Sequence, residues 1–479
     1  MNYTDVLIIG SGPGGSISGY EIIKKTNLKV TIFEKGKLKS NKLKPYSSQE
    51  MDEAYYRSGL SACFGKGDLI FATAETLGGG SEINSGFFLD LPKKIFDNWK
   101  KNIDNLSLSE IKKNLREIKF FLKVNSSKND EGKASLILKK GCNKLKLDSK
   151  RTERWIRSSK KKNTWRHERY GMVNTYLKMF KKHGGTIKTN HNVIKIINKD
   201  INKSFYTILY SNNGEKKYIK CKYIFVCGGS IMTPEFLLNS GIRKNIGKTL
   251  KFHQMSRLVA ESNNEINENE FGVPVRQVNH YKPDMTFGCS VSTKQHLALW
   301  MSSNKSLKKI LRNYKKYSIY YSLINSKTEG KIIKPFENFG SAIFYSISQE
   351  DIEKHKLSIK RLAKILFLGG IKRIFLSSGN KNNKDQLSFK SIHEINNFLM
   401  KKKYIPELSS IHLFSSVPMG KKDQYPLDSY GKLKKPNENI YVNDSSMLPS
   451  PTGVNPQGII MALAKRNVEK FIKNLINTK

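Results

Sequence analysis

Asp5-Val6-Leu7-Ile8-Ile9-Gly10-Ser11-Gly12-Pro13-Gly14-Gly15 is the stretch that decides the fold, together with Glu34. The apolar run predicts a β-strand, and the glycines after it predict a tight turn into a helix that extends to Lys25. A second apolar run at 30–33 predicts a strand that ends at Glu34. The order is therefore strand, glycine turn, helix, strand and acid.

This order is typical of a dinucleotide site. Gly10 permits the tight turn, Gly12 lets the backbone approach a pyrophosphate, and Gly15 lets the helix pack close to the strand. The helix N-terminus then presents free N–H groups to the phosphates. Glu34 follows Gly15 by nineteen positions, close to the roughly 20-residue spacing of an acid that binds a ribose. We expect a dinucleotide-binding domain; the alternative is a glycine-rich turn without a ligand.

Length and charge limit the class of protein. The 479 residues are too many for one compact core and predict two joined domains. The formal net charge of +45 is typical of proteins that bind nucleic acid or anionic membranes. The basic residues are mostly lysines spread along the chain, whereas phosphate and base recognition favours arginine. We therefore expect a solvated basic surface, with weak association to anionic surfaces and no specific nucleic acid; a dedicated polyanionic partner is the alternative.

The cysteines and the apolar runs predict a cytoplasmic protein. Five cysteines without C-x-x-C spacing indicate neither a disulfide framework nor a metal site. The first predicted strand starts by residue 5, so we expect no signal peptide. No run approaches the ~18 apolar residues that a membrane span needs, so we expect no transmembrane segment.

A second glycine cluster, Gly78-Gly79-Gly80, precedes Ser81 and Asn84. Bare backbone can lie against a flat or anionic ligand, and the two polar side chains can donate to it. The alternative is a surface turn. Further on, the strand 223–227 runs into Gly228 and a helix, and we expect this strand in the nucleotide-binding sheet.

The middle of the chain predicts two other parts. Residues 96–150 show helical spacing, and the arginine-rich stretch 151–169 is interpreted as a solvated helix and loop with Trp155 and Trp165 buried; an anion- or partner-binding face is the alternative. Strand-like runs and amphipathic helices from 257 to 408 predict a substrate domain. One predicted helix carries a core-packing stripe: Leu307, Ile310, Leu311, Tyr314, Tyr317 and Tyr321.

In this order, the motifs resemble those of the glucose–methanol–choline (GMC) flavoprotein oxidoreductases. The resemblance extends from residue 5 to about residue 468 and covers 256–411 only loosely. The matching motifs are the first glycine turn with Glu34, Leu77 to Asn84, Gly229-Ser230-x-x-Thr233-Pro234, Asn245-Ile246-Gly247 with His253, the His412 segment, Tyr441 to Ser446, and Asn455-Pro456.

The resemblance implies an α/β fold: a Rossmann-like FAD-binding domain, discontinuous in sequence, with an inserted substrate domain built on a mostly antiparallel sheet. The implied division is 1–95, 166–255 and 412–479 for the FAD-binding parts, 96–165 for a helical Lys/Arg-rich excursion, and 256–411 for the substrate domain.

The cofactor implied is FAD. Ile83 stands where some members attach flavin through a histidine, so we expect non-covalent binding. The residues that the resemblance assigns to the cofactor are Gly10, Gly12, Gly14, Gly15, Glu34, Gly79, Gly80, Ser81, Asn84, Val193, Gly228, Asp444, Ser445, Asn455 and Pro456.

The resemblance also assigns the chemistry. His412 and Asn455 match the pair that faces the flavin in sterol-oxidase-like members. We expect His412 to be the general base and Asn455 to position the hydroxyl in the oxidation of an alcohol. His253 is expected to be structural and remote from the flavin ring. The alternatives are a non-redox lyase that keeps FAD and a polyanion-binding flavoprotein.

Overall fold

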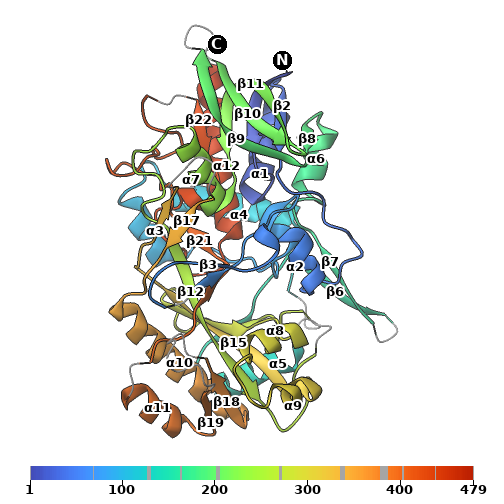
Figure 1. Cartoon of the computed structure of the whole chain (residues 1–479), viewed down its shortest axis with the longest axis vertical. Helices are drawn as coiled ribbons and strands as arrows, with labels where there is room; N and C mark the ends of the chain where they lie inside the picture. The colour runs from blue at the N-terminus through green and yellow to red at the C-terminus, as the bar shows by residue number, and fades with distance from the viewer. Residues whose placement is uncertain are drawn as a thin grey trace.

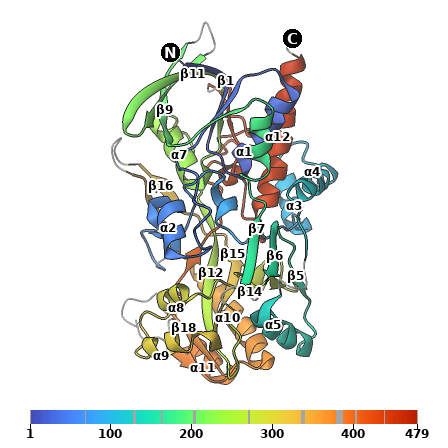
Figure 2. The same ribbon diagram turned by 90° about the vertical axis from the view of Figure 1, so that its right-hand side faces the viewer.

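The computed structural model describes residues 2–67, 69–126, 131–161, 164–200, 205–268, 272–334, 340–377, 387–401, 404–436 and 439–477. Two large β-sheets lie toward opposite ends of the elongated molecule, each with its own helices (Figure 1). Both labelled chain ends lie beside the first sheet (Figures 1 and 2).

The first sheet is the predicted nucleotide-binding sheet. Its strand order is β8-β2-β1-β11-β10-β9, and β22 also pairs with β11. The pairings of β1 with β2 and β11, of β2 with β8, and of β11 with β22 are parallel, as in a Rossmann-like fold. β9 and β10 extend it as antiparallel strands. The strands are β1 (Asn2–Ile9), β2 (Val30–Phe33), β8 (Thr186–Lys188), β9 (His191–Asp200), β10 (Phe205–Asn212), β11 (Glu215–Val226) and β22 (Ile440–Val442).

Helices from both ends of the sequence pack beside this sheet. α1 contacts α12 and α6, and α12 contacts α4. Buried side chains of β1, β2, β11 and α12 share one hydrophobic core. The helices are α1 (Pro13–Lys25), α4 (Leu108–Phe121), α6 (Tyr176–Lys182), α7 (Gly229–Asn239) and α12 (Gln457–Asn477).

The second sheet has the order β3-β4-β20-β12-β15-β14-β13-β5, and β18 and β21 also pair with β12. From β12 to β5 every pairing is antiparallel, which confirms the predicted sheet type. α10 and α5 share a second core with it. The strands are β3 (Ser61–Ala62), β4 (Ile70–Phe71), β5 (Ser149–Arg151), β12 (Lys251–Glu261), β13 (Arg276–Val278), β14 (Met285–Cys289), β15 (Tyr317–Asn325), β18 (Arg373–Leu376), β19 (Leu387–Phe389), β20 (Ser409–Ser410) and β21 (Leu413–Phe414).

β12 runs from the middle of the molecule into its lower half (Figure 1). Its first residues pair with β21, and the remainder pairs with β15 and β18. Because side chains alternate along a strand, His253, Met255 and Arg257 lie on one face of β12.

The stretch 151–169 is not the helix and loop that we expected. β5 joins the second sheet, and β6 (Ile156–Lys161) and β7 (Thr164–Arg169) form an antiparallel hairpin. Trp155 is buried as expected; the side chain of Trp165 lies outside the described part. The sequence of this stretch concealed strand pairing, because its charged residues interrupt the apolar alternation that marks a half-buried strand.

The predicted helical stripe at 307–321 is also partly wrong. α9 (Leu307–Arg312) ends before Tyr317, which begins β15. β15 is buried on nearly all of its length, so its tyrosines and isoleucines show no polar alternation that distinguishes a strand from a buried helix.

Two predicted boundaries fall inside strands, the one at 165 in β7 and the one at 255 in β12. The division into five segments otherwise stays a prediction. Among the described helices, none is long and apolar enough to cross a membrane. The remaining helices and strands are α2 (Ser48–Ala54), α3 (Lys93–Lys100), α5 (Gly132–Lys144), α8 (Lys294–Trp300), α10 (Gln349–Gly369), α11 (Ile392–Lys401), β16 (Lys331–Ile333) and β17 (Ala342–Phe344).

Candidate active site

A cavity of about 860 Å³ is lined by residues of both sheets. One part of its lining comes from the first glycine turn, Glu34, the start of β9 and the turn before α7. Another part comes from β12, β15 and α8. The cavity therefore joins the predicted nucleotide site to the predicted substrate domain.

The glycines of the first turn divide into two groups. A Cβ on Gly12 would have no neighbour closer than 3.9 Å, so this position is open on the cavity side. A Cβ on Gly14 would lie 1.7 Å from the Asn443 carbonyl oxygen, and one on Gly15 would lie 2.0 Å from that of Gly10. Gly15 thus packs the helix against the strand, as expected, and does not line the cavity. The N-cap residue of α1 is Gly12, which has no side chain to cap the helix, and this leaves the first N–H groups for an anion.

Glu34 is buried and lines the cavity. Its Oε2 accepts hydrogen bonds from the Ser11 N–H at 2.9 Å and the Ser11 hydroxyl at 2.7 Å, and its Oε1 accepts one from the Gly36 N–H at 2.8 Å. Burial raises the pKa of Glu34, while these hydrogen bonds oppose that rise. The carboxylate is fixed in place and keeps lone pairs for further donors.

The second glycine cluster contributes backbone. Gly79, Gly80 and Asn84 line the cavity, and a Cβ on Gly80 would meet nothing within 4 Å. The buried Ser81 hydroxyl donates to the Gly78 carbonyl and accepts the Met172 N–H, both at 2.9 Å. Ser81 therefore stabilises the turn and is absent from the described lining.

Val193, Gly228, Asp444 and Ser445 also line the cavity. Asp444 already accepts four hydrogen bonds, from the Gly229 N–H, the Thr233 hydroxyl, and the N–H and hydroxyl of Ser446. This carboxylate primarily fastens the start of α7 to the segment after β22.

The start of α12 offers unused donors to the cavity. Pro456 and Gln457 line it, and the positive end of the helix lies there. Gln457 Oε1 accepts from Asn84 Nδ2 at 2.8 Å, whereas the buried Gln457 Nε2 has no partner within the described part of the chain. A buried amide donor without a partner is costly, so this position suits a ligand carbonyl.

The residues present fit FAD. The open glycines, the uncapped helix and Glu34 suit an adenosine diphosphate group, and Gln457 with the start of α12 suits a flavin carbonyl.

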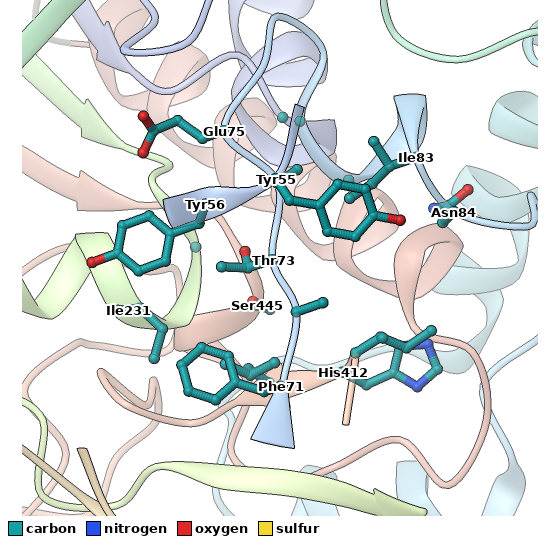
Figure 3. Close-up of a pocket in the computed structure, with 18 of the residues that line it drawn as sticks. Tyr55, Tyr56, Phe71, Thr73, Glu75, Ile83, Asn84, Ile231, His412 and Ser445 are labelled. Carbon is teal, nitrogen blue, oxygen red and sulfur yellow. The ribbon is translucent and has the colours of Figure 1, made fainter. Parts of the chain in front are cut away.

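His412 lies between β20 and β21 and lines the cavity. Figure 3 shows it near Phe71, with Ile83 and Asn84 higher in the same view. Burial lowers the pKa of His412 to about 4, so the ring is neutral near pH 7.

Two chains of hydrogen bonds converge on His412. In the first, the Gly453 N–H donates to His253 Nε2 at 3.0 Å, so the neutral His253 ring carries its proton on Nδ1. That Nδ1 lies 3.2 Å from His412 Nδ1. His253 therefore contacts the candidate base directly, while its expected distance from the flavin ring stays a prediction.

The second chain begins at Lys282, whose Nζ donates to Gln277 Oε1 at 2.9 Å. Gln277 Nε2 then donates to Asn455 Oδ1 at 3.0 Å, which turns Asn455 Nδ2 toward His412 Nε2 at 3.4 Å. The structure thus brings together the predicted pair, His412 and Asn455.

Both chains present a donor to His412, and a neutral imidazole has one acceptor nitrogen. The chain from Gly453 favours the tautomer with a lone pair on Nδ1, and the chain from Lys282 favours a lone pair on Nε2. A protonated ring would meet a donor on both sides, so the arrangement disfavours the charged form.

Sequence reasoning missed most of the substrate side. Gln277, Lys282, Tyr321 and Trp300 have no motif that marks them. The sequence could have indicated Arg257, because it follows His253 by four residues and side chains alternate along a strand, so both lie on the same face of β12.

Known proteins resemble this chain in sequence and in fold. Models of the GMC oxidoreductase family match residues 51–255 (N-terminal model) and 335–464 (C-terminal model). The GMC-type oxidoreductase y4nJ of Sinorhizobium fredii is 27% identical over 98% of this chain and 95% of its own length. Long-chain-alcohol oxidase FAO3 of Arabidopsis thaliana is 24% identical over 96% of this chain, which spans 66% of that protein. The fold is similar to that of pyridoxine 4-oxidase from Mesorbium loti, with a TM-score of 0.72 and 13% identity over 98% of this chain and 99% of that one.

Proposed function

Since this chain belongs to the GMC oxidoreductase family, we propose that it oxidises the CH–OH group of a small-molecule alcohol at this cavity, with FAD as its cofactor. Bound FAD supplies the hydride acceptor. The observation that carries the proposal is the contact between His412 and Asn455 in a cavity whose other part fits a dinucleotide.

The substrate hydroxyl binds between His412 and Asn455. Asn455 Nδ2 donates to the hydroxyl oxygen, because Gln277 already occupies Asn455 Oδ1. His412 Nε2 takes the hydroxyl proton, in the tautomer that the chain from Lys282 favours. The donors on both sides then favour loss of that proton to solvent, which restores the neutral ring.

His253 acts as a positioning residue. Its Nδ1–H faces His412 Nδ1 and opposes the tautomer in which Nε2 is the base. The balance between the two chains sets how readily His412 accepts a proton.

FAD is bound without a covalent link, a proposal supported by Ile83, an unreactive side chain, at the cavity wall (Figure 3). Acid precipitation of the purified holoprotein is expected to leave the yellow colour in the supernatant. A yellow pellet after washing would contradict this.

Anaerobic mixing with alcohols tests the function. The flavin absorbance should bleach with at least one member of a panel of long-chain alcohols, sterols, sugars and polyols. A flavoprotein that no alcohol bleaches but that cleaves cyanohydrins would support the lyase instead, and selective polyanion binding without a flavin requirement would support the third alternative.

The five cysteines are free thiols, which supports the cytoplasm as the compartment that we propose.

A further inference from the structure

Arg257 places a cation in the wall of the cavity on the substrate side. It lies on the face of β12 that carries His253, four residues further along the strand. At roughly 3.3 Å per residue, the two backbone positions are about 13 Å apart. A substrate whose hydroxyl binds at His412 therefore has to extend along β12 to contact Arg257.

The guanidinium contacts two neutral side chains. Its centre lies 4.8 Å from the Trp300 ring centre, and its Nη1 donates to the Ser290 hydroxyl at 2.9 Å. Trp300 and Ser290 also line the cavity. Stacking on an indole leaves the edge of the guanidinium plane available for hydrogen bonds.

That edge is unused. Arg257 Nε is buried and has no hydrogen-bond partner within the described part of the chain, where the bond to Ser290 is the one hydrogen bond of this guanidinium. A buried N–H without a partner costs free energy that a bound acceptor restores. The unused Nε edge has the geometry that binds a carboxylate with two parallel hydrogen bonds.

The charge of Arg257 is incompletely compensated. Burial lowers its pKa to about 10, and the opposing effects of Tyr321 and the Glu407 carboxylate do not cancel this. The same cation contributes to the low pKa of His296, about 4, after burial of that ring. A buried cation in this state favours a bound anion.

We infer that the substrate is an alcohol with a carboxylate remote from its hydroxyl, and that Arg257 binds this carboxylate through the Nε edge of its guanidinium. The inference rests on the proposed alcohol oxidation and adds the chemical class of the substrate. Apolar cavity residues between the two ends, among them Met255 and Leu323, suit a hydrocarbon chain.

The holoenzyme tests this without mutation. We would compare kcat/KM for ω-hydroxyalkanoates of increasing chain length, their methyl esters and the matched primary alkanols. At the best chain length, the acid should exceed its ester and the alkanol by about 10–100-fold, the range expected for a charge-assisted hydrogen bond. An ester or alkanol that equals the acid at every length would overturn the inference.

Variants locate the effect. Arg257→Gln should remove the preference for the acid, and Arg257→Lys should keep part of it, since the charge remains without the planar edge. Arg361→Gln is the matched control, because Arg361 stacks on Tyr281 at 4.4 Å but is absent from the described lining of the cavity. An unchanged preference in Arg257→Gln, or its loss in Arg361→Gln, would contradict the assignment.

Binding separates this inference from the proposed function. Laurate, which has no hydroxyl to oxidise, should bind the holoprotein and perturb the flavin spectrum or release heat. Its Kd should rise about 10–100-fold in Arg257→Gln and stay constant in Arg361→Gln. If no alcohol bleaches the flavin but laurate binding depends on Arg257, the oxidation fails and the anion site stands. An unchanged Kd for laurate in Arg257→Gln would refute the site, even if the enzyme oxidises alcohols.

Discussion

At the scale of single residues, His412 carries the proposed proton transfer. His412→Asn should retain FAD, because the glycine turns and Glu34 are unchanged. Its flavin reduction by substrate should slow by about 10²–10⁴-fold, the range of a lost general base. Stopped-flow absorbance measures the rate, and His183→Asn, at an exposed histidine, is the control. If His412→Asn binds FAD and its flavin is reduced at the parent rate, His412 is not the general base.

The pH dependence follows from the low pKa of His412. The base acts in its neutral form, which is present above the pKa and is lost as the pH falls through it. Since burial lowers that pKa to about 4, kcat/KM should be constant from neutrality down to about pH 5 and should fall near pH 4. A decline centred near pH 6.5, the ordinary pKa of histidine, would contradict the burial of the ring.

A substitution of His253 should change the pH at which kcat/KM falls. His253→Phe removes the donor that faces His412 Nδ1. Protonation of His412 then becomes easier and its pKa rises, so the fall in kcat/KM at acid pH should move to higher pH. The same variant leaves the buried Gly453 N–H without its acceptor and should lower stability by about 1–3 kcal/mol. A purely structural role would lower stability and leave the pH of that fall unchanged.

At the scale of elements, substitutions at Gly14 and Gly80 distinguish a glycine needed for packing from one expected to contact the cofactor. Gly14→Ala should prevent folding, because its Cβ would lie 1.7 Å from a carbonyl oxygen. Gly80→Ala has open space and should fold, but its methyl group would occupy the cavity where we place FAD. We expect soluble apoprotein with weaker FAD affinity, measured by flavin titration and thermal melting. Equal FAD affinity in Gly80→Ala and the parent would show that FAD does not contact this glycine.

The elements that the sequence revealed are those with local signals. The first strand, the glycine turn, α1 and Glu34 follow one another along 34 residues, so their geometry is encoded locally. The prediction for β15 was wrong because a strand buried on both faces has no alternation of apolar and polar residues. The prediction for the hairpin of β6 and β7 was wrong because charged residues interrupt that alternation. Gln277 and Lys282 come close to Asn455 through the tertiary fold, and the spacing of residues in the sequence does not indicate this.

At the scale of the whole molecule, the net charge of +45 should produce attraction to polyanions without selectivity. Retention on heparin is expected to collapse as salt rises, because the Debye length is about 8 Å at 0.15 M. Neutral dextran resin is the control. Tight binding to one polyanion at that ionic strength would favour the partner-binding alternative.

The pairing of β1 with β11, and of β11 with β22, has a consequence for synthesis of the chain. The ribosome completes β1 more than 400 residues before β22 and α12, yet these close the same sheet and the same cavity. The core that β1 shares with β22 and α12 therefore stays incomplete through nearly the whole of translation. Incomplete chains that stop before Asn455 would lack both this partner of His412 and the donors of Gln457, so the complete site for FAD forms only in nearly finished molecules.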